Sequence, residues 1–296
     1  MPKAIRRLAQ SAIHLLKRDH KYFLFREIAH DLGIASVTAN GPIGLMEGSL
    51  DDWTIFRRYV HGGAWETRTS HVCIDYFKRY GAGTFVDVGA NIGMVFVPVV
   101  REAGCFGIAI DASPTNFSYL ATNCLRNLDF RSYKLNQIAV GDRAGKVKFD
   151  TSSSNFGDHK ISEVGTIEVD LMRFDDLYNA RDFARPVLVK LDIQGAEPEF
   201  FAGATNLLAV CDAMVLEYSP FGEKGYDWIG EFDRKIIENF SRMLRYDRVR
   251  NHHGDAEKPE LVNQNALDGI KRSIAARQWH DPREGHENLL LLRASD

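Results

Sequence analysis

The sequence lacks the features that mark several classes of protein. Its net charge is −3 at pH 7, so it does not carry the strong basic excess that is typical of nucleic-acid-binding domains. No apolar run approaches the length of a membrane span, and none has the form of a signal peptide. We therefore expect no nucleic-acid partner, no transmembrane segment and no cleaved leader.

Cysteine is also scarce. There are four cysteines, no two of them form a C-x-x-C pair, and each lies among apolar residues. This pattern indicates buried, reduced thiols rather than a disulfide framework. The expectation is a reducing compartment and hence a cytoplasmic location.

The remaining composition is that of an ordinary globular protein, with 45% apolar and 26% charged residues. A chain of 296 residues suffices for one large α/β domain and an extension. We expect the extension, residues 1–80, to consist of helices and a hairpin around Asn40-Gly41-Pro42, and the larger domain to span residues 81–296.

The first 19 residues place basic side chains around apolar ones, which is typical of an amphipathic helix. Such a helix could touch an anionic membrane surface, or it could pack on its own domain or on a second subunit. Packing is the commoner outcome, so a homodimer formed through the N-terminal region is one expectation.

A strand, a glycine-containing turn and a helix follow one another from Thr84 to Val100. Gly89 and Gly93 permit the turn and allow a ligand to approach the backbone closely. The middle glycine of the dinucleotide motif G-x-G-x-x-G is missing, and Asp87 would repel a diphosphate. A cationic ligand, such as a sulfonium that carries an ammonium group, suits this turn better.

Strands and helices alternate through the rest of the chain, which predicts an α/β fold with a mostly parallel sheet. Extended segments at 146–150 and 165–170 flank a polar stretch, 151–160, that we expect to be a surface loop. The seven predicted sheet strands are 84–88, 106–110, 133–140, 186–192, 213–217, 246–250 and 288–293.

Acidic residues lie in or directly after four of these strands, near their carboxyl ends, and the carboxyl ends of parallel strands face one crevice. Asp111 lies 22 positions after Gly89, where an acid can bind both hydroxyls of a ribose. Gln137, Ala139 and Asp142 are candidates to border an adenine ring. The acids expected at this edge, with perturbed pKa values, are Asp87, Asp111, Asp192, Glu197 and Glu217.

Five motifs in the same order resemble those of the FkbM family of S-adenosylmethionine-dependent methyltransferases. They are DVGANIG (87–93), DASPTN (111–116), AVGD (139–142), KLDIQGAE (190–197) and GA (203–204). The family usually has Glu-Pro where this chain has Asp111-Ala112, and Glu is common where Gln194 stands. The resemblance covers about residues 60–293. It implies a Rossmann-like class I methyltransferase fold, S-adenosylmethionine as cofactor, and O-methylation of a sugar, glycolipid or natural product.

The resemblance and the strand ends together indicate two sets of site residues. The cofactor would be bound by Glu66, Asp87, Gly89, Asn91, Gly93, Asp111, Ala112, Ala139 and Asp192, with Trp65 as a wall of the pocket. Candidates for the base that takes the acceptor proton are Asp192, Glu197, Glu217 and His71, with Asp192 as first choice. The aromatic residues of 218–228 and the pair His252–His253 are candidates to line the site of a small-molecule or glycan acceptor.

Three other interpretations remain open at this point. A nicotinamide-dependent oxidoreductase is disfavoured by the missing glycine. A non-catalytic Rossmann-like module that binds a nucleotide or a partner would not need Asp87 and Asp111. A divalent metal held by Asp192 and Glu217 is a weak alternative, because no spaced ligand motif accompanies them, and we expect no metal.

Overall fold

The computed structural model describes residues 17–152, 155, 157, 159–162, 164–220, 226–246, 259–277 and 285–293, and only the backbone of 226–229. Most of the basic N-terminal segment and the pair His252–His253 lie outside these residues. Among the described helices, none has the length and apolar character needed to cross a membrane.

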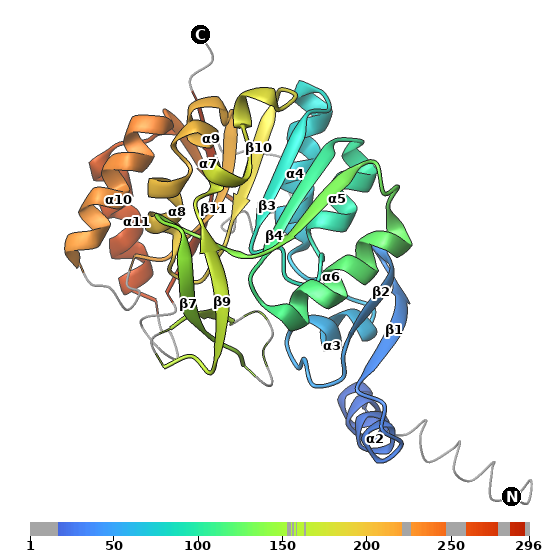
Figure 1. Cartoon of the computed structure of the whole chain (residues 1–296). Helices are drawn as coiled ribbons and strands as arrows, with labels where there is room; N and C mark the ends of the chain where they lie inside the picture. Colours follow the sequence, from blue (N-terminus) through green and yellow to red (C-terminus); the bar gives the residue numbers. More distant parts are fainter. Residues whose placement is uncertain are drawn as a thin grey trace, which may run out of the picture.

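An eight-stranded sheet runs through the molecule in the order β13-β12-β14-β11-β10-β3-β4-β5 (Figure 1). The strands from β11 to β5 are parallel, whereas β14 is antiparallel to both of its neighbours. This confirms the α/β fold with a mostly parallel sheet, with the two-residue β13 as an additional edge strand. Their bounds are β3 (Thr84–Val88), β4 (Phe106–Asp111), β5 (Tyr133–Gln137), β10 (Val187–Leu191), β11 (Ala213–Tyr218), β12 (Arg242–Arg245), β13 (Glu260–Leu261) and β14 (Glu287–Leu292).

Helices cover both faces of this sheet, because the central strands are apolar on both sides. All five residues of β3 and of β10 are buried, as expected for parallel strands between two layers of helices. One face packs against α4 (Thr67–Tyr80), α5 (Phe96–Ala103) and α6 (Pro114–Asn127). The other packs against α8 (Glu197–Gly203), α9 (Thr205–Val210), α10 (Tyr226–Asn239) and α11 (Gln264–Ala275) (Figure 1).

The sixth predicted strand, 246–250, lies outside the described residues except for Tyr246. The structure has a strand directly before it, β12, where Met243 pairs with Leu291 of β14. The preceding helix, expected to reach Leu244, ends at Asn239. The error arose because the apolar side chains of Met243 and Leu244 continue the helical pattern, whereas pairing with β14 draws them into the sheet.

A second sheet, β6-β9-β7-β8, lies beside the carboxyl ends of the parallel strands. The predicted strand 133–140 is divided between the two sheets, since β5 ends at Gln137 and the next pair of residues joins β9. The expected extended segments 146–150 and 165–170 are confirmed. The bounds are β6 (Ala139–Val140), β7 (Gly145–Asp150), β8 (Lys160–Ile161) and β9 (Ile167–Met172), followed by the short helices α7 (Phe174–Leu177) and η1 (Ala180–Asp182).

The N-terminal segment contains the expected helices and hairpin. They are α2 (Arg18–Asp31), the paired strands β1 (Ser36–Gly41) and β2 (Gly44–Ser49), and α3 (Ile55–Val60). Met46, Phe56 and Tyr59 pack in the same cluster as Phe77 and Phe96, so this segment and the large sheet share one core. The division of the chain at residue 80 stays a prediction.

All four cysteines are buried and free, as the sequence indicated.

Candidate active site

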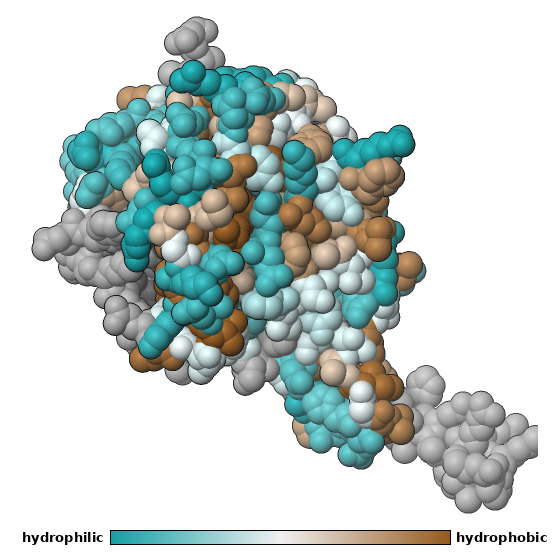
Figure 2. All heavy atoms as spheres, in the orientation of Figure 1, coloured by the Kyte–Doolittle hydropathy of each residue, from teal (hydrophilic) through white to brown (hydrophobic). Residues whose placement is uncertain are grey.

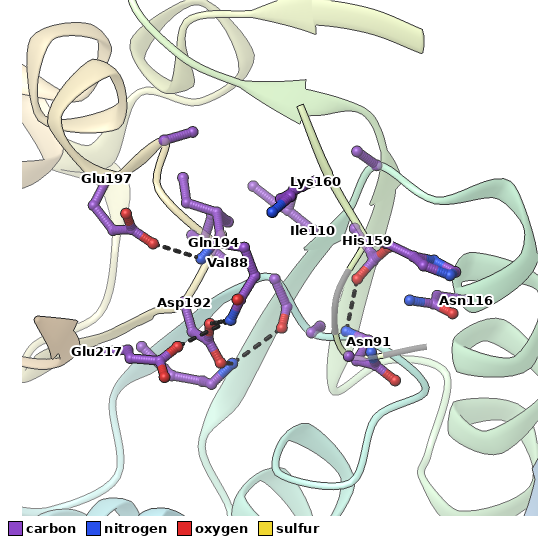
Figure 3. Close-up of a pocket in the computed structure, with 18 of the residues that line it drawn as sticks. Val88, Asn91, Ile110, Asn116, His159, Lys160, Asp192, Gln194, Glu197 and Glu217 are labelled. Carbon is purple, nitrogen blue, oxygen red and sulfur yellow. Dashed lines mark hydrogen bonds and ion pairs between the residues drawn. The ribbon is translucent and has the colours of Figure 1, made fainter. Parts of the chain in front are cut away.

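A pocket of about 640 Å³ opens at the carboxyl ends of β3, β4, β10 and β11 (Figure 3). Its walls come from the turns after these strands, from the second sheet, and from Trp65 and Glu66 before α4. This is the crevice at which ligands bind in open α/β sheets. The sequence predicted a site at these strand ends, and a pocket lies there.

Backbone strain is concentrated at this pocket. Glu66, Asn91 and Gln194 are the described non-glycine residues with positive φ, at 46°, 52° and 55°, and all three line the pocket. A left-handed conformation costs free energy at a residue that has a Cβ, and such residues gather where function requires them. The surrounding structure must therefore stabilise the left-handed backbone conformation of each of these three residues.

Asp111 ties the end of β4 to the turn after β3. One carboxylate oxygen accepts a hydrogen bond from the backbone N–H of Asn91 at 2.7 Å, and the other from that of Ser113 at 2.9 Å. Burial raises the pKa of Asp111 to about 7, although these two N–H groups act to lower it. Both oxygens retain further lone pairs, so the carboxyl group can also accept from a ligand in the pocket.

An apolar wall adjoins Asp111. Ala112 and Ala139 belong to it, as expected, whereas Gln137 and Asp142 do not line the pocket. The other apolar residues of this wall are Ile110, Ile138, Phe149 and Ile161.

Lys190 is buried beneath the pocket floor and neutralises two acids. Its Nζ lies 3.4 Å from Asp87, 3.6 Å from Asp192, and donates to the carbonyl of Gly89 at 3.0 Å. Burial acts to lower the pKa of Lys190, but the two aspartates hold it well above its usual value. Asp87 does not line the pocket, so it positions Lys190 rather than meeting a ligand directly.

Asp192, Gln194 and Glu217 point toward one another on the other side of the pocket (Figure 3). The Gln194 amide donates to Asp192 at 2.8 Å and to Glu217 at 3.0 Å. Burial acts to raise the pKa of Asp192, but Lys190 and these hydrogen bonds hold it below its usual value. Burial and the charge of Asp192 raise the pKa of Glu217 well above its usual value. Nδ1 of His286 lies 3.1 Å from the remaining oxygen of Glu217.

Glu197 shapes the turn after β10. Its two carboxylate oxygens accept from the backbone N–H groups of Ile193 at 2.9 Å and Gly195 at 3.0 Å. Burial raises its pKa to about 7. Because its oxygens hold the turn, Glu197 is better suited to fixing Gln194 than to taking a proton from an acceptor.

Glu66 closes the pocket near Lys190. Its carboxylate accepts from Trp65 Nε1 at 3.2 Å, and burial raises its pKa to about 7 despite the nearby lysine. Both residues line the pocket, where the sequence placed them.

Three predicted site residues do not line the pocket, namely Asp87, described above, and His71 and Gly93. His71 is exposed on α4, away from the lining residues, so the structure removes it from the candidate bases. Gly93 serves the turn itself, with φ at 92°, and an added Cβ would lie 3.1 Å from Leu120. The other predicted cofactor residues in the lining are Gly89, Asn91 and Asp192.

The sequence missed two groups of lining residues. In the stretch expected to be a surface loop, the described residues Asn155, Gly157, His159 and Lys160 line the pocket, next to the pairing of Phe149 of β7 with Ile161 of β8. His159 there lies 3.0 Å from Ser113 Oγ and from the carbonyl of Ser152. No local sequence signal marks these residues, nor the second group near β14. The missed polar residues are Asn155, His159, Lys160, Ser219, His286 and Asn288.

No group of three or more metal-ligating side chains occurs among the residues that the structure describes.

Comparisons with known proteins identify relatives of this chain. A model of the FkbM methyltransferase domain matches residues 87–253, more than half of the sequence. Hexuronic acid methyltransferase AglP of Haloferax volcanii is 28% identical over 137 residues, which cover 44% of this chain and 54% of AglP. The chain thus spans about half of the length of this curated relative.

Solved structures with a similar arrangement are distant in sequence. Magnesium protoporphyrin IX methyltransferase of Synechocystis PCC 6803, with bound SAM, is 11% identical with a TM-score of 0.38, over 77% of this chain and 79% of that one. TYW2 of M. jannaschii, in complex with AdoMet, is 13% identical with a TM-score of 0.39, over 88% and 87%. Because these TM-scores are below 0.5, nothing known of those proteins is extended to this chain. The match over residues 87–253 shows, by contrast, that the chain belongs to the FkbM methyltransferase family.

Proposed function

We propose that this protein transfers a methyl group from S-adenosylmethionine to a hydroxyl of a sugar or glycan. The family membership supports the reaction type, and the similarity to AglP supports a sugar as acceptor. The observation that carries the proposal is one pocket of about 640 Å³ that has an apolar wall beside Asp111 and a carboxyl cluster opposite it.

The pocket residues fit the chemistry of this cofactor. Asp111 and the turn at Asn91 would hold the ribose hydroxyls, and the wall around Ala112 and Ala139 would border the adenine. The charged carboxylate of Asp192, together with Glu66, suits a ligand that carries an ammonium and a sulfonium group. When bound, S-adenosylmethionine supplies a methyl group that its sulfonium already activates.

The protein's own groups must then orient the acceptor hydroxyl and receive its proton. Asp192 was the first choice as base, but its lowered pKa and its pairing with Lys190 make it a weak one. Glu217 and His286 form a carboxyl–imidazole pair at 3.1 Å, and both line the pocket. In this pair the imidazole takes the proton, and Glu217 orients the ring through its contact with Nδ1.

Calorimetry with S-adenosylhomocysteine tests the cofactor. Binding by the wild-type chain is expected, and an Asp111→Ala variant that keeps its fold should bind much more weakly. Absence of binding at millimolar ligand would refute the proposal. If Asp111→Ala bound as tightly as the wild type, the ribose assignment would be wrong.

Mass spectrometry tests the acceptor. Neutral hexoses, hexuronic acids and short glycans would be incubated with the enzyme and S-adenosylmethionine, and a product heavier by one methyl group is expected from at least one. Cofactor binding without methylation of any hydroxylated sugar would retain the methyltransferase but exclude this acceptor class.

A further inference from the structure

One side of helix α2 presents apolar side chains that no described part of the chain covers. Leu24, Phe25, Ile28 and Leu32 are 41%, 46%, 51% and 71% exposed. Their spacing of three and four residues places them on one stripe of the helix. Figure 2 shows hydrophobic atoms gathered on one side of this helix, at the lower right, with hydrophilic atoms on its other side.

Basic residues lie on the same stripe. Lys17 and Lys21 precede Leu24 and Ile28 at helical spacing, and Arg18 lies seven positions before Phe25. An open hollow of about 440 Å³ lies beside this stripe, and its lining includes Arg18, Lys21, Phe25 and His61. Residues 1–16 add Lys3, Arg6 and Arg7 and contain no acidic residue. The N-terminal end of the stripe therefore combines exposed apolar area with positive charge, while Asp31 lies beside its C-terminal end.

The opposite side of α2 is attached to the rest of the protein. The hydroxyl of Tyr22 donates to the carbonyl of Leu50 at 3.0 Å, and Arg26 donates to Asp51 at 2.9 Å. Arg57 of α3 binds Asp19 at 2.8 Å. These bonds fix the rotation of the helix, so the apolar and basic stripe faces outward.

We propose that α2 is an interfacial helix that binds the surface of an anionic lipid bilayer. Apolar side chains on such a helix enter the boundary between headgroups and acyl chains, while lysine and arginine meet the lipid phosphates. A second copy whose α2 packed parallel on this stripe would bring Lys17, Arg18 and Lys21 of both copies together, whereas an antiparallel copy would not, so the test below separates self-association from lipid binding. This inference rests on α2 alone and does not depend on the proposed reaction.

Vesicle flotation with the full-length chain tests the inference. The chain should bind vesicles of phosphatidylcholine with phosphatidylglycerol, should bind pure phosphatidylcholine far less, and should be released at high salt, which screens the phosphates. The double variant Phe25→Ser/Ile28→Ser should reduce binding by about a hundredfold, because each side chain loses burial worth roughly tenfold or more in affinity. The variant Lys17→Glu/Lys21→Glu should also weaken binding to anionic vesicles.

The matched control is Leu125→Ser/Phe130→Ser, because these side chains are 72% and 69% exposed but lie away from α2. It should bind vesicles as the wild type does, and thermal unfolding would verify that every variant is folded. Equal binding to neutral and anionic vesicles, or no binding to either, would overturn the inference. Sedimentation that showed a dimer lost in Phe25→Ser/Ile28→Ser, without vesicle binding, would overturn it in favour of self-association.

Discussion

At the scale of single residues, Glu217 and His286 have separable roles. If the imidazole takes the acceptor proton, His286→Asn should lower kcat by about 10²–10⁴-fold. Glu217→Gln should also lower kcat, because the glutamine NH₂ group can donate to Nδ1 and hold the ring in the wrong tautomer. Steady-state kinetics across pH would measure both effects. A large loss in Glu217→Gln with little change in His286→Asn would make Glu217 itself the base.

The buried carboxyl groups predict a stability that depends on pH. The pKa of Asp111 is raised from 3.8 in the unfolded chain to about 7 in the fold. Its stabilising contribution is therefore complete at low pH and is lost as pH rises toward 7, since the unfolded chain ionises first. The pKa values of Glu66 and Glu197 are raised from 4.5 to about 7, so these groups also lower the free energy of unfolding as pH rises. The pKa of Asp192 is lowered, so this group has the opposite effect.

Urea unfolding of the ligand-free chain would measure this dependence. The free energy of unfolding should fall between about pH 5 and pH 7, and Asp111→Asn should make that slope shallower, by on the order of 2–4 kcal/mol across the range. Asp142→Asn, at an exposed position, is the control and should keep the wild-type slope. An unchanged slope in Asp111→Asn would show that this carboxyl group is not the source.

Gly89 is a position where only glycine fits. An added Cβ would lie 1.8 Å from the carbonyl oxygen of Asp192, and φ is 80°. Gly89→Ala should therefore lower the free energy of unfolding by more than about 2 kcal/mol, through both the clash and the strain. Gly81→Ala separates the two causes, since its φ of 97° is similar and no atom lies near its added Cβ. Thermal unfolding should show a smaller loss of stability for Gly81→Ala than for Gly89→Ala. Equal losses would mean that the structure around residue 89 shifts to accommodate the added Cβ.

At the scale of elements, helix α6 and the second sheet are joined at Ser113. The Ser113 hydroxyl accepts from the N–H of Asn116 as the cap of α6, and it also meets His159 above the pocket. Ser113→Ala should cost about 1 kcal/mol for the lost cap and should also weaken cofactor binding. Asn263→Ala removes the equivalent cap of α11, far from the pocket lining, and should cost similar stability without affecting binding. If Ser113→Ala and Asn263→Ala bound the cofactor with equal affinity, the contact between Ser113 and His159 would not contribute to cofactor binding.

At the scale of the whole molecule, the sequence predicted what local patterns encode. The buried runs of β3 and β10 and the acids that follow them located the crevice, because parallel strands bring their carboxyl ends together. Lys160 and His286 could not be placed in this way. Their positions depend on the pairing of β7 with β8 and of β14 with β11, which are contacts between segments distant in the chain. The early end of the helix before β12 has the same origin, since the pairing of β12 with β14 overrides a helical pattern.

Strand β14 has a consequence for synthesis of the protein. It is the last described strand in the chain, yet it lies between β11 and β12 and pairs with both. Leu289 and Leu291 enter the core on one face, while Leu290 and Leu292 pack on the other. During synthesis, β11 and β12 therefore have no strand between them until residues 287–292 have emerged from the ribosome. The sheet, and with it the Glu217–His286 pair, is completed only then, and before that the apolar edges of both strands need protection from other chains.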